Sequence, residues 1–216
     1  MNEKALKFFT ELAQKEHVSP NDVRLSKFNH FTEYDVDFIK NNVNVNSEVL
    51  DVGAGSGLIV NQIVESVKFI EALEPIKAYS DFITRSEKIH IVNATIEEYT
   101  ITKQFDFVLC YGVMHYLNAE EAGAFYKKFY HAVKPSGKII VKNQFGVNED
   151  VFINNFSEEL QTMYYAEYRT VEHEKKLLAQ AGFKNFEVVD IYPPECNRWD
   201  NTHYYAIAAE KEANEA

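Results

Sequence analysis

One stretch limits what this chain can fold into more than any other: residues 48–58, which read Glu-Val-Leu-Asp-Val-Gly-Ala-Gly-Ser-Gly-Leu. The apolar run from Val49 to Val52 predicts a short buried strand, and a helix-like run over residues 58–64 follows the glycines. Glycine lets a ligand come close to the backbone, and the start of a helix presents unpaired N–H groups. The stretch therefore predicts a strand, a tight turn and a helix, with a polar cofactor across the turn.

The spacing of the glycines narrows the choice of cofactor. Dinucleotide sites place their third glycine three residues after the second, whereas Gly53, Gly55 and Gly57 are evenly spaced. Asp51 precedes the first glycine by two residues. A carboxylate at this place repels a pyrophosphate but accepts hydrogen bonds from an ammonium group. We therefore expect a ligand with a positively charged amino acid end.

Length, composition and charge set further limits. A chain of 216 residues is long enough for one domain, or one domain with a small cap. The net charge of -11, without a basic run, disfavours binding to a nucleic acid backbone. There is no leader-like start and no apolar run of membrane-spanning length, and Cys110 and Cys196 have no metal-type spacing. These features predict a cytoplasmic protein, monomeric or homodimeric, without membrane partner or metal site.

Apolar runs predict the remaining strands, at residues 69–74, 89–92, 105–111, 138–141, 186–191 and 204–209. Helical patterns separate most of them, among them a predicted helix over residues 76–85, and this alternation is typical of parallel strands joined by crossovers. Only residues 193–202 separate the last two strands, too few for a helical crossover, so the final strand should run antiparallel.

At this point the chain resembles the class I S-adenosylmethionine (SAM)-dependent methyltransferases, whose first motif has the form of the turn at residues 51–57. The run Met114-His115-Tyr116-Leu117 is similar to a Leu-His-His-Leu type run of that family, and residues 134–137 match its Lys-Pro-x-Gly turn. The resemblance covers about residues 48–211. It implies an α/β fold with a three-layer, doubly wound, seven-stranded sheet, mostly parallel with the last strand antiparallel. SAM is then the cofactor, with S-adenosylhomocysteine as product.

The domain organisation follows from the same pattern. Residues 1–46 predict a helical cap, and the resemblance implies a lid whose tips are Phe28 and His30. Residues 47–216 form the SAM-binding domain. Within it the pattern loosens at about 144–166, where we expect a substrate-side insertion.

Several residues are expected to hold the cofactor. Glu74 ends the second strand about twenty residues past the turn, where an acid accepts hydrogen bonds from ribose hydroxyls. Asn93 takes the place of the family's usual Asp, and the backbone N–H of Ala94 or Thr95 is within reach of the adenine ring. The end of the fourth strand should face the transferable methyl. The predicted cofactor-binding residues are Asp51, Gly53, Ala54, Gly55, Glu74, Pro75, Asn93, Ala94, Thr95, Cys110 and Tyr111.

Other residues are candidates for catalysis and substrate binding. His115 follows the fourth strand and is the candidate general base, with a packed histidine at a helix start as the alternative. Arg169 suits a clamp for a carboxylate or phosphate, or else a surface ion pair with Glu167 or Glu172. The predicted substrate-binding residues are His30, Tyr165, Arg169, Trp199 and His203.

The predicted activity is methyl transfer from SAM to an oxygen or nitrogen of a small polar metabolite, such as a sugar or another biosynthetic intermediate. Two alternatives stay open: a methyltransferase acting on a macromolecule such as tRNA, and a non-catalytic SAM-binding partner subunit. A nicotinamide-dependent oxidoreductase is disfavoured by the glycine spacing and the antiparallel ending.

Overall fold

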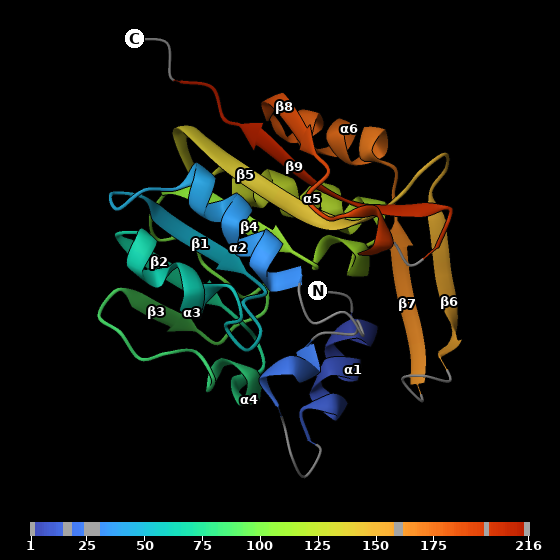
Figure 1. The fold of residues 1–216 in the computed structure, drawn as a ribbon, viewed down its shortest axis with the longest axis horizontal. Helices are drawn as coiled ribbons and strands as arrows, with labels where there is room; N and C mark the ends of the chain where they lie inside the picture. Colours follow the sequence, from blue (N-terminus) through green and yellow to red (C-terminus); the bar gives the residue numbers. More distant parts are fainter. Residues whose placement is uncertain (1–2, 15–18, 24–30, 158–161, 197–198, 214–216) are drawn as a thin grey trace.

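A seven-stranded sheet forms the centre of the protein (Figure 1). The computed structural model describes residues 3–14, 19–23, 31–157, 162–196 and 199–213. In space the strands follow the order β3, β2, β1, β4, β5, β9, β8. Their bounds are β1 (Glu48–Val52), β2 (Phe69–Leu73), β3 (Ile89–Val92), β4 (Phe105–Tyr111), β5 (Val133–Gly146), β8 (Lys184–Val189) and β9 (Thr202–Glu210).

The pairing of the strands confirms the predicted fold class. Strand β1 runs parallel to β2 and β4, β3 is parallel to β2, and β5 is parallel to β4. The last strand, β9, is antiparallel to both of its neighbours, β5 and β8, and lies between them. The chain thus winds outward from β1 in two directions, and the order reverses between β1 and β4. In an open α/β sheet, ligands bind beyond the carboxyl ends of the strands at such a reversal.

Helices cover both faces of the sheet, because alternate residues of each strand point to opposite faces. Val49 of β1 packs in a cluster with residues of α2 (Phe31–Asn42) and α3 (Val60–Ile63). Leu50 and Val52 pack in a second cluster with residues of α5 (Ala119–Tyr130) and α6 (Val171–Ala181). The result is three layers with an apolar core on each side of the sheet.

The N-terminal segment lies against the edge of the sheet at which the parallel strands have their carboxyl ends. It contains α1 (Glu3–Leu12), the short helix η1 (Pro20–Val23) and α2. The ring of Phe9 meets that of Tyr116 edge-on at 5.4 Å, and the Tyr79 hydroxyl donates to the Phe9 carbonyl oxygen at 3.3 Å. Phe28 and His30, the expected tips of a lid, lie outside the described residues.

The stretch expected as a loose insertion, residues 144–166, is more regular than its sequence pattern indicates. Strand β5 continues through Gly146, and β6 (Val151–Ser157) then pairs antiparallel with β7 (Thr162–Tyr168). Figure 1 shows this hairpin standing apart from the central sheet.

One predicted helix, over residues 76–85, is reduced to the single turn α4 (Lys77–Ser80). The side chain of Asn61 gives the physical reason, because it donates to the Phe82 carbonyl at 3.1 Å and accepts from the Thr84 N–H at 2.8 Å. These two bonds replace the helical hydrogen bonds that would continue α4.

Helix α5 begins with a capping box that should be measurable in stability. The Asn118 side chain accepts from the Glu121 N–H at 2.9 Å, and the Glu121 carboxylate accepts from the Asn118 N–H at 2.8 Å. We expect Asn118→Ala to lower the free energy of unfolding by about 1 kcal/mol, measured by urea titration. Asn118→Asp, which keeps the acceptor, is the matched control and should stay within a few tenths of a kcal/mol of the parent. An equal loss in both variants would contradict the role of the cap.

Candidate active site

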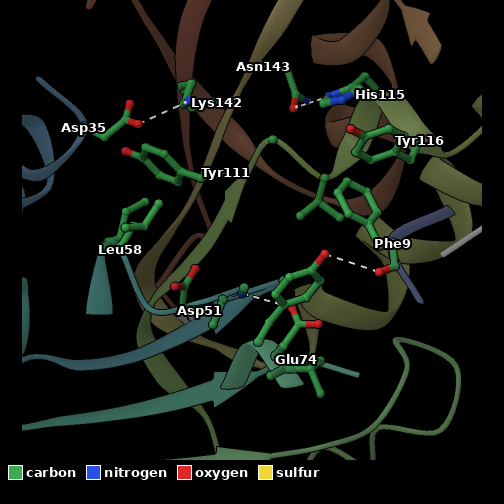
Figure 2. A pocket seen from close by; sticks show the side chains of 18 of the residues that line it. Phe9, Asp35, Asp51, Leu58, Glu74, Tyr111, His115, Tyr116, Lys142 and Asn143 are labelled. Atoms are coloured by element: carbon green, nitrogen blue, oxygen red, sulfur yellow. Dashed lines mark hydrogen bonds and ion pairs between the residues drawn. The ribbon is translucent and has the colours of Figure 1, made fainter. Parts of the chain in front are cut away.

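A pocket of about 270 Å³ opens at the sheet edge where β1, β2 and β4 end (Figure 2). Its floor comes from the glycine turn after β1 and from the residues that follow β2 and β4. Its other walls come from α1, α2, the end of β5, and strands β7 and β9. The pocket thus occupies the position that the reversal of strand order predicts for a ligand.

The glycine turn lies close against its neighbours. The backbone N–H groups of Gly53 and Ala54 both donate to the Leu73 carbonyl oxygen, at 2.8 and 3.0 Å. Gly53, Gly55 and Gly57 have φ angles of 76°, 54° and 76°, in the left-handed region that side chains disfavour. A Cβ on Gly53 would also stand 2.5 Å from Val113 Cγ2. The turn can therefore bring its backbone to the pocket only with glycine at these positions.

Glu74 is joined to this turn by hydrogen bonds. One carboxylate oxygen accepts from the Gly55 N–H and the other from the Ile76 N–H, each at 2.9 Å. The residue is 6% exposed, and the surface it keeps lines the pocket. Each carboxylate oxygen has a second lone pair, so Glu74 can still accept hydrogen bonds from two ligand hydroxyls.

Two acids make this part of the pocket electronegative. Burial, followed by the negative charge of Glu74, raises the pKa of Asp51 to about 7. Burial also raises the pKa of Glu74 to about 7, although the hydrogen bonds from Ile76 and Gly55 oppose the rise. A cation placed between the two carboxyl groups would relieve their repulsion and favour ionisation. The chemistry of these donors and acceptors suits a positively charged ligand that carries hydroxyl groups.

The other predicted cofactor residues divide into two groups. Pro75, Ala94 and Tyr111 line the pocket together with the residues of the turn. The side chains of Asn93, Thr95 and Cys110 are not part of its lining.

Each of these three exceptions is occupied elsewhere. The Asn93 amide donates to the Glu74 carbonyl and to Ser80 Oγ, both at 2.8 Å, so it positions the floor of the pocket from behind. The Thr95 N–H donates to Glu98, and Cys110 is fully buried in the core under α5. The pocket lining thus gives no support to the direct cofactor contacts expected of Asn93, Thr95 and Cys110. The loop between β3 and β4 contributes Ala94 and Ile96 as apolar walls instead.

His115 lies in the pocket wall on the short helix η3 (Met114–Tyr116), directly after β4. Its Nδ1 is 3.2 Å from Asn143 Oδ1, and its ring packs on Tyr116 at 4.0 Å. Burial lowers the pKa of His115 to about 4, with the positive charges of Lys142 and Arg169 acting in the same direction. The imidazole is therefore neutral at physiological pH. When Nδ1–H donates to Asn143, the lone pair of Nε2 is able to accept a proton.

The expected substrate contacts lie largely outside the pocket lining. The Tyr165 hydroxyl donates to Glu167, His203 Nε2 is 2.9 Å from Asp190 Oδ1, and Trp199 is 43% exposed. The pocket takes Tyr164 and Tyr168 from β7 instead of Tyr165. His30 lies outside the described residues.

Arg169 requires a correction. Its guanidinium is buried and pairs with Glu174 at 2.6 Å, while its other nitrogens donate to the carbonyl oxygens of Leu117 and Met114, at 2.6 and 2.7 Å. Glu167 lies 3.5 Å from it, so one partner of the ion-pair alternative is present, but the pair is buried and not at the surface as that alternative expected. The clamp for a substrate anion is therefore withdrawn, because these internal partners use the guanidinium. Arg169 holds both ends of the turn that carries His115.

Several pocket residues were not predicted. An ion pair joins Lys142 of β5 to Asp35 of α2 at 3.3 Å, and Figure 2 shows it across the pocket from His115. A signal existed for part of the set, because alternation along β7 places Tyr164, Ala166 and Tyr168 on one face. The unpredicted lining residues that are aromatic or polar are Phe9, Phe31, Asp35, Tyr79, Tyr116, Lys142, Asn143, Gln144, Tyr164, Tyr168 and Tyr204.

The lining falls into two groups along the chain. The acids, the glycine turn, Ala94 and His115 all lie within residues 51–116. The facing wall comes from residues 9–35 and 142–204. We call the first group the cofactor wall and the second group the acceptor wall.

Both the sequence and the fold of this chain are similar to those of known proteins. Residues 49–137 match the family model described as a methyltransferase domain. In solved structures, a SAM-dependent methyltransferase from Leishmania major superposes over 94% of this chain and 81% of its own, with a TM-score of 0.72 and 20% identity. The 1,6-didemethyltoxoflavin-N1-methyltransferase of Burkholderia thailandensis covers 90% of this chain and 84% of its own, with a TM-score of 0.68 and 18% identity. The chain therefore has the fold of the class I SAM-dependent methyltransferases, as the resemblance in its sequence implied, and residues 49–137 are similar to a methyltransferase domain.

Among curated relatives, a ubiquinone biosynthesis O-methyltransferase of Rickettsia prowazekii is 32% identical over 126 residues, 54% of this chain. The match spans 49% of that protein, so the chain corresponds to about half the length of this relative. Within the part of the chain that the structure describes, no helix is long and apolar enough to cross a bilayer. The same residues contain no cluster of three His, Cys, Asp or Glu side chains that could hold a metal ion.

The raised pKa values of Asp51 and Glu74 should make stability depend on pH. Between the pKa of an unfolded carboxyl group, about 4, and the native value near 7, the folded state binds more protons than the unfolded state. The free energy of unfolding contributed by these groups therefore falls as pH rises through this interval. We expect Asp51→Asn to flatten the fall, measured as the difference between variant and parent in urea unfolding at pH 5 and pH 8. An unchanged slope would contradict the assignment.

The buried pair of Arg169 and Glu174 should act as a unit in stability. Arg169→Leu leaves the Glu174 carboxylate unpaired and removes the donors to Met114 and Leu117, so we expect a loss of about 3–5 kcal/mol in urea unfolding. The double variant Arg169→Leu/Glu174→Leu should recover a substantial part of that loss, because no buried charge is then left alone. Losses that simply add would refute the coupling.

Proposed function

We propose that this chain transfers a methyl group from SAM to an oxygen or nitrogen atom of a small molecule. The observation that carries the proposal is the pair of buried carboxylates, Asp51 and Glu74, beside the glycine turn in one pocket. SAM carries an ammonium and a sulfonium, which suit these acids, and a ribose whose hydroxyls suit the free lone pairs of Glu74. Ala94 and Ile96 supply flat apolar surface for the adenine.

When bound, SAM supplies an electrophilic methyl group, and the protein must align an attacking atom with the bond that breaks. Tyr111, Gly112 and Val113 lie at and just after the end of β4 and form the last part of the cofactor wall before His115. Aromatic rings of the acceptor wall line this space, and a pocket of this size with apolar walls suits a small molecule as acceptor.

His115 is the candidate general base. Its low pKa keeps it neutral, and the bond to Asn143 directs which nitrogen accepts a proton. A weak base is sufficient, because a hydroxyl becomes strongly acidic once its oxygen has gained the methyl group. A neutral amine acceptor would need no base before transfer. The O-methyltransferase activity named for the Rickettsia relative supports an oxygen acceptor.

Calorimetric titration with S-adenosylhomocysteine tests the cofactor. We expect binding to the parent protein and a loss of at least tenfold in affinity for Glu74→Ala, because the variant removes the acceptors for the ribose hydroxyls. Glu65→Ala, whose side chain is 82% exposed, is the matched control and should bind as the parent does. The ammonium group of the bound ligand should also favour ionisation of the two acids and so release protons near pH 7. The release is seen as a heat that varies with the ionisation enthalpy of the buffer.

NAD is the competing ligand in the same experiment. Binding of NAD without binding of S-adenosylhomocysteine would refute the proposal. Turnover is tested separately, by incubating the protein with SAM and pooled small-molecule acceptors and searching by mass spectrometry for products heavier by one methyl group. Affinity for SAM without any product over a broad acceptor pool would favour the non-catalytic alternative.

A further inference from the structure

The acceptor wall contains a polar cluster that the proposed function does not use. Lys142 Nζ lies 3.3 Å from Asp35 Oδ2, and the Tyr192 hydroxyl donates to Asp35 Oδ1 at 2.7 Å. The side chains of Lys142 and Asp35 are only 12% and 7% exposed, and both line the pocket. A buried ion pair is costly to form, and a hydrophobic pair of similar size would often be more stable. Its place in a pocket wall favours a role in binding.

Aromatic rings hold the lysine in place. The ammonium lies 5.2 Å from the ring centre of Tyr192, 5.5 Å from that of Tyr111 and 6.0 Å from that of Tyr204. Cation–π attraction at these distances favours one orientation of a side chain that is otherwise flexible. The cluster is therefore organised before any ligand arrives.

Tyr111 supplies the second observation. Its hydroxyl oxygen is buried, and it has no hydrogen-bond partner among the described residues. Figure 2 shows the hydroxyl end of Tyr111 directed toward the side of the pocket where Asp35 and Lys142 lie. A buried hydroxyl without a partner has lost its hydrogen bonds to water, so a ligand that restores one gains affinity.

The charges select the chemistry of the ligand group. Asp35 repels a carboxylate or phosphate brought to Lys142, and Lys142 repels an ammonium brought to Asp35. A neutral hydroxyl satisfies both, because its oxygen accepts from an ammonium or a phenol and its proton is donated to a carboxylate. Aromatic side chains, Phe31 and Tyr204 among them, also line the pocket and contact each other, which favours a flat ring packed against this aromatic surface.

We propose that Lys142, Asp35 and Tyr111 form a recognition site for a hydroxyl group on a planar ring of the methyl acceptor. This inference rests on the proposed function and specifies its substrate class as hydroxylated aromatic compounds. Tyr111 and Lys142 are direct neighbours in the register of β4 and β5, and the next residue of β5, Asn143, bonds His115. A ring held at Lys142 can therefore turn another of its groups toward His115 and the end of β4.

Ligand-observed NMR at millimolar concentration tests the site, with the protein saturated with S-adenosylhomocysteine. The probes are phenol, catechol, toluene and benzoate. We expect phenol and catechol to bind at least tenfold more tightly than toluene, which has the ring without the hydroxyl. Benzoate should bind more weakly than phenol because of the charge of Asp35.

The affinity ratio of phenol to toluene is the readout for variants, because general damage to the pocket changes both affinities together. Lys142→Met and Tyr111→Phe should each reduce this ratio at least fivefold. Lys138→Met, on the same strand but paired with Glu210 at the surface, is the matched control and should keep the ratio of the parent. Tyr111→Phe guards against misfolding, because it removes a hydroxyl without a described partner. Its melting temperature should equal or exceed that of the parent.

The outcomes separate this inference from the proposed function. Failure of S-adenosylhomocysteine to bind the parent protein overturns the proposed function, and this inference with it. Binding of S-adenosylhomocysteine combined with equal affinities for phenol and toluene overturns the recognition site alone. Tighter binding of benzoate than of phenol does the same, as does a phenol-to-toluene ratio that the Lys142 and Tyr111 variants leave unchanged.

Discussion

Two backbone amides, those of Gly53 and Ala54, share one acceptor, the carbonyl oxygen of Leu73 at the end of the neighbouring strand. The pocket depends on this contact. It folds the turn back over the end of β2, where the two carboxylate oxygens of Glu74 accept hydrogen bonds from the N–H groups of Gly55 and Ile76. The positive φ angles of the glycines make the contact sterically possible. Strand, turn and acid therefore form one hydrogen-bonded unit at the reversal of the sheet.

The same unit concentrates negative charge in a buried place. Burial raises the cost of ionising both Asp51 and Glu74, and the charge of Glu74 adds to this cost at Asp51, so the ligand-free protein keeps groups that weaken it near neutral pH. Neutral residues at these two positions would cost the ligand-free protein little stability. The presence of the acids therefore indicates a role in binding. On the other side of the pocket the charges are balanced, because Lys142 and Asp35 neutralise each other in a wall of aromatic rings. One side thus suits a cation and the other a neutral polar group.

The local patterns of the sequence predict the sheet well. Strand β3 and strand β4 have the predicted bounds, and the antiparallel final strand follows from a loop too short for a crossover. The helix over residues 76–85 failed because a side chain 21 residues earlier, Asn61, replaces its hydrogen bonds. No local pattern contains such a long-range contact. The position of β9 between β5 and β8 was likewise not predicted, because the order of strands in space also depends on long-range contacts.

For the site, the pocket positions of Asp51 and Glu74 were predictable, because both have a fixed spacing from the glycines. Residues brought to the pocket by tertiary packing were not predictable. Arg169 and Asp35 do not, since burial against Glu174 and Lys142 decides what each can do. Tyr165 was misassigned by one position, because a strand turns successive side chains to opposite faces and the direction of β7 depends on its hairpin partner.

The division of the pocket into two walls has a consequence for how such a chain can diversify. The cofactor wall is contributed by residues 51–116, inside the region that matches the methyltransferase family model. The acceptor wall is contributed by the N-terminal helices and by residues from 142 onward, beyond that region. Under the proposed function, substitutions in the acceptor wall can therefore change the acceptor without touching the turn and acids. New substrates then become accessible through residues 9–35 and 142–204, while residues 51–116 keep the binding of SAM.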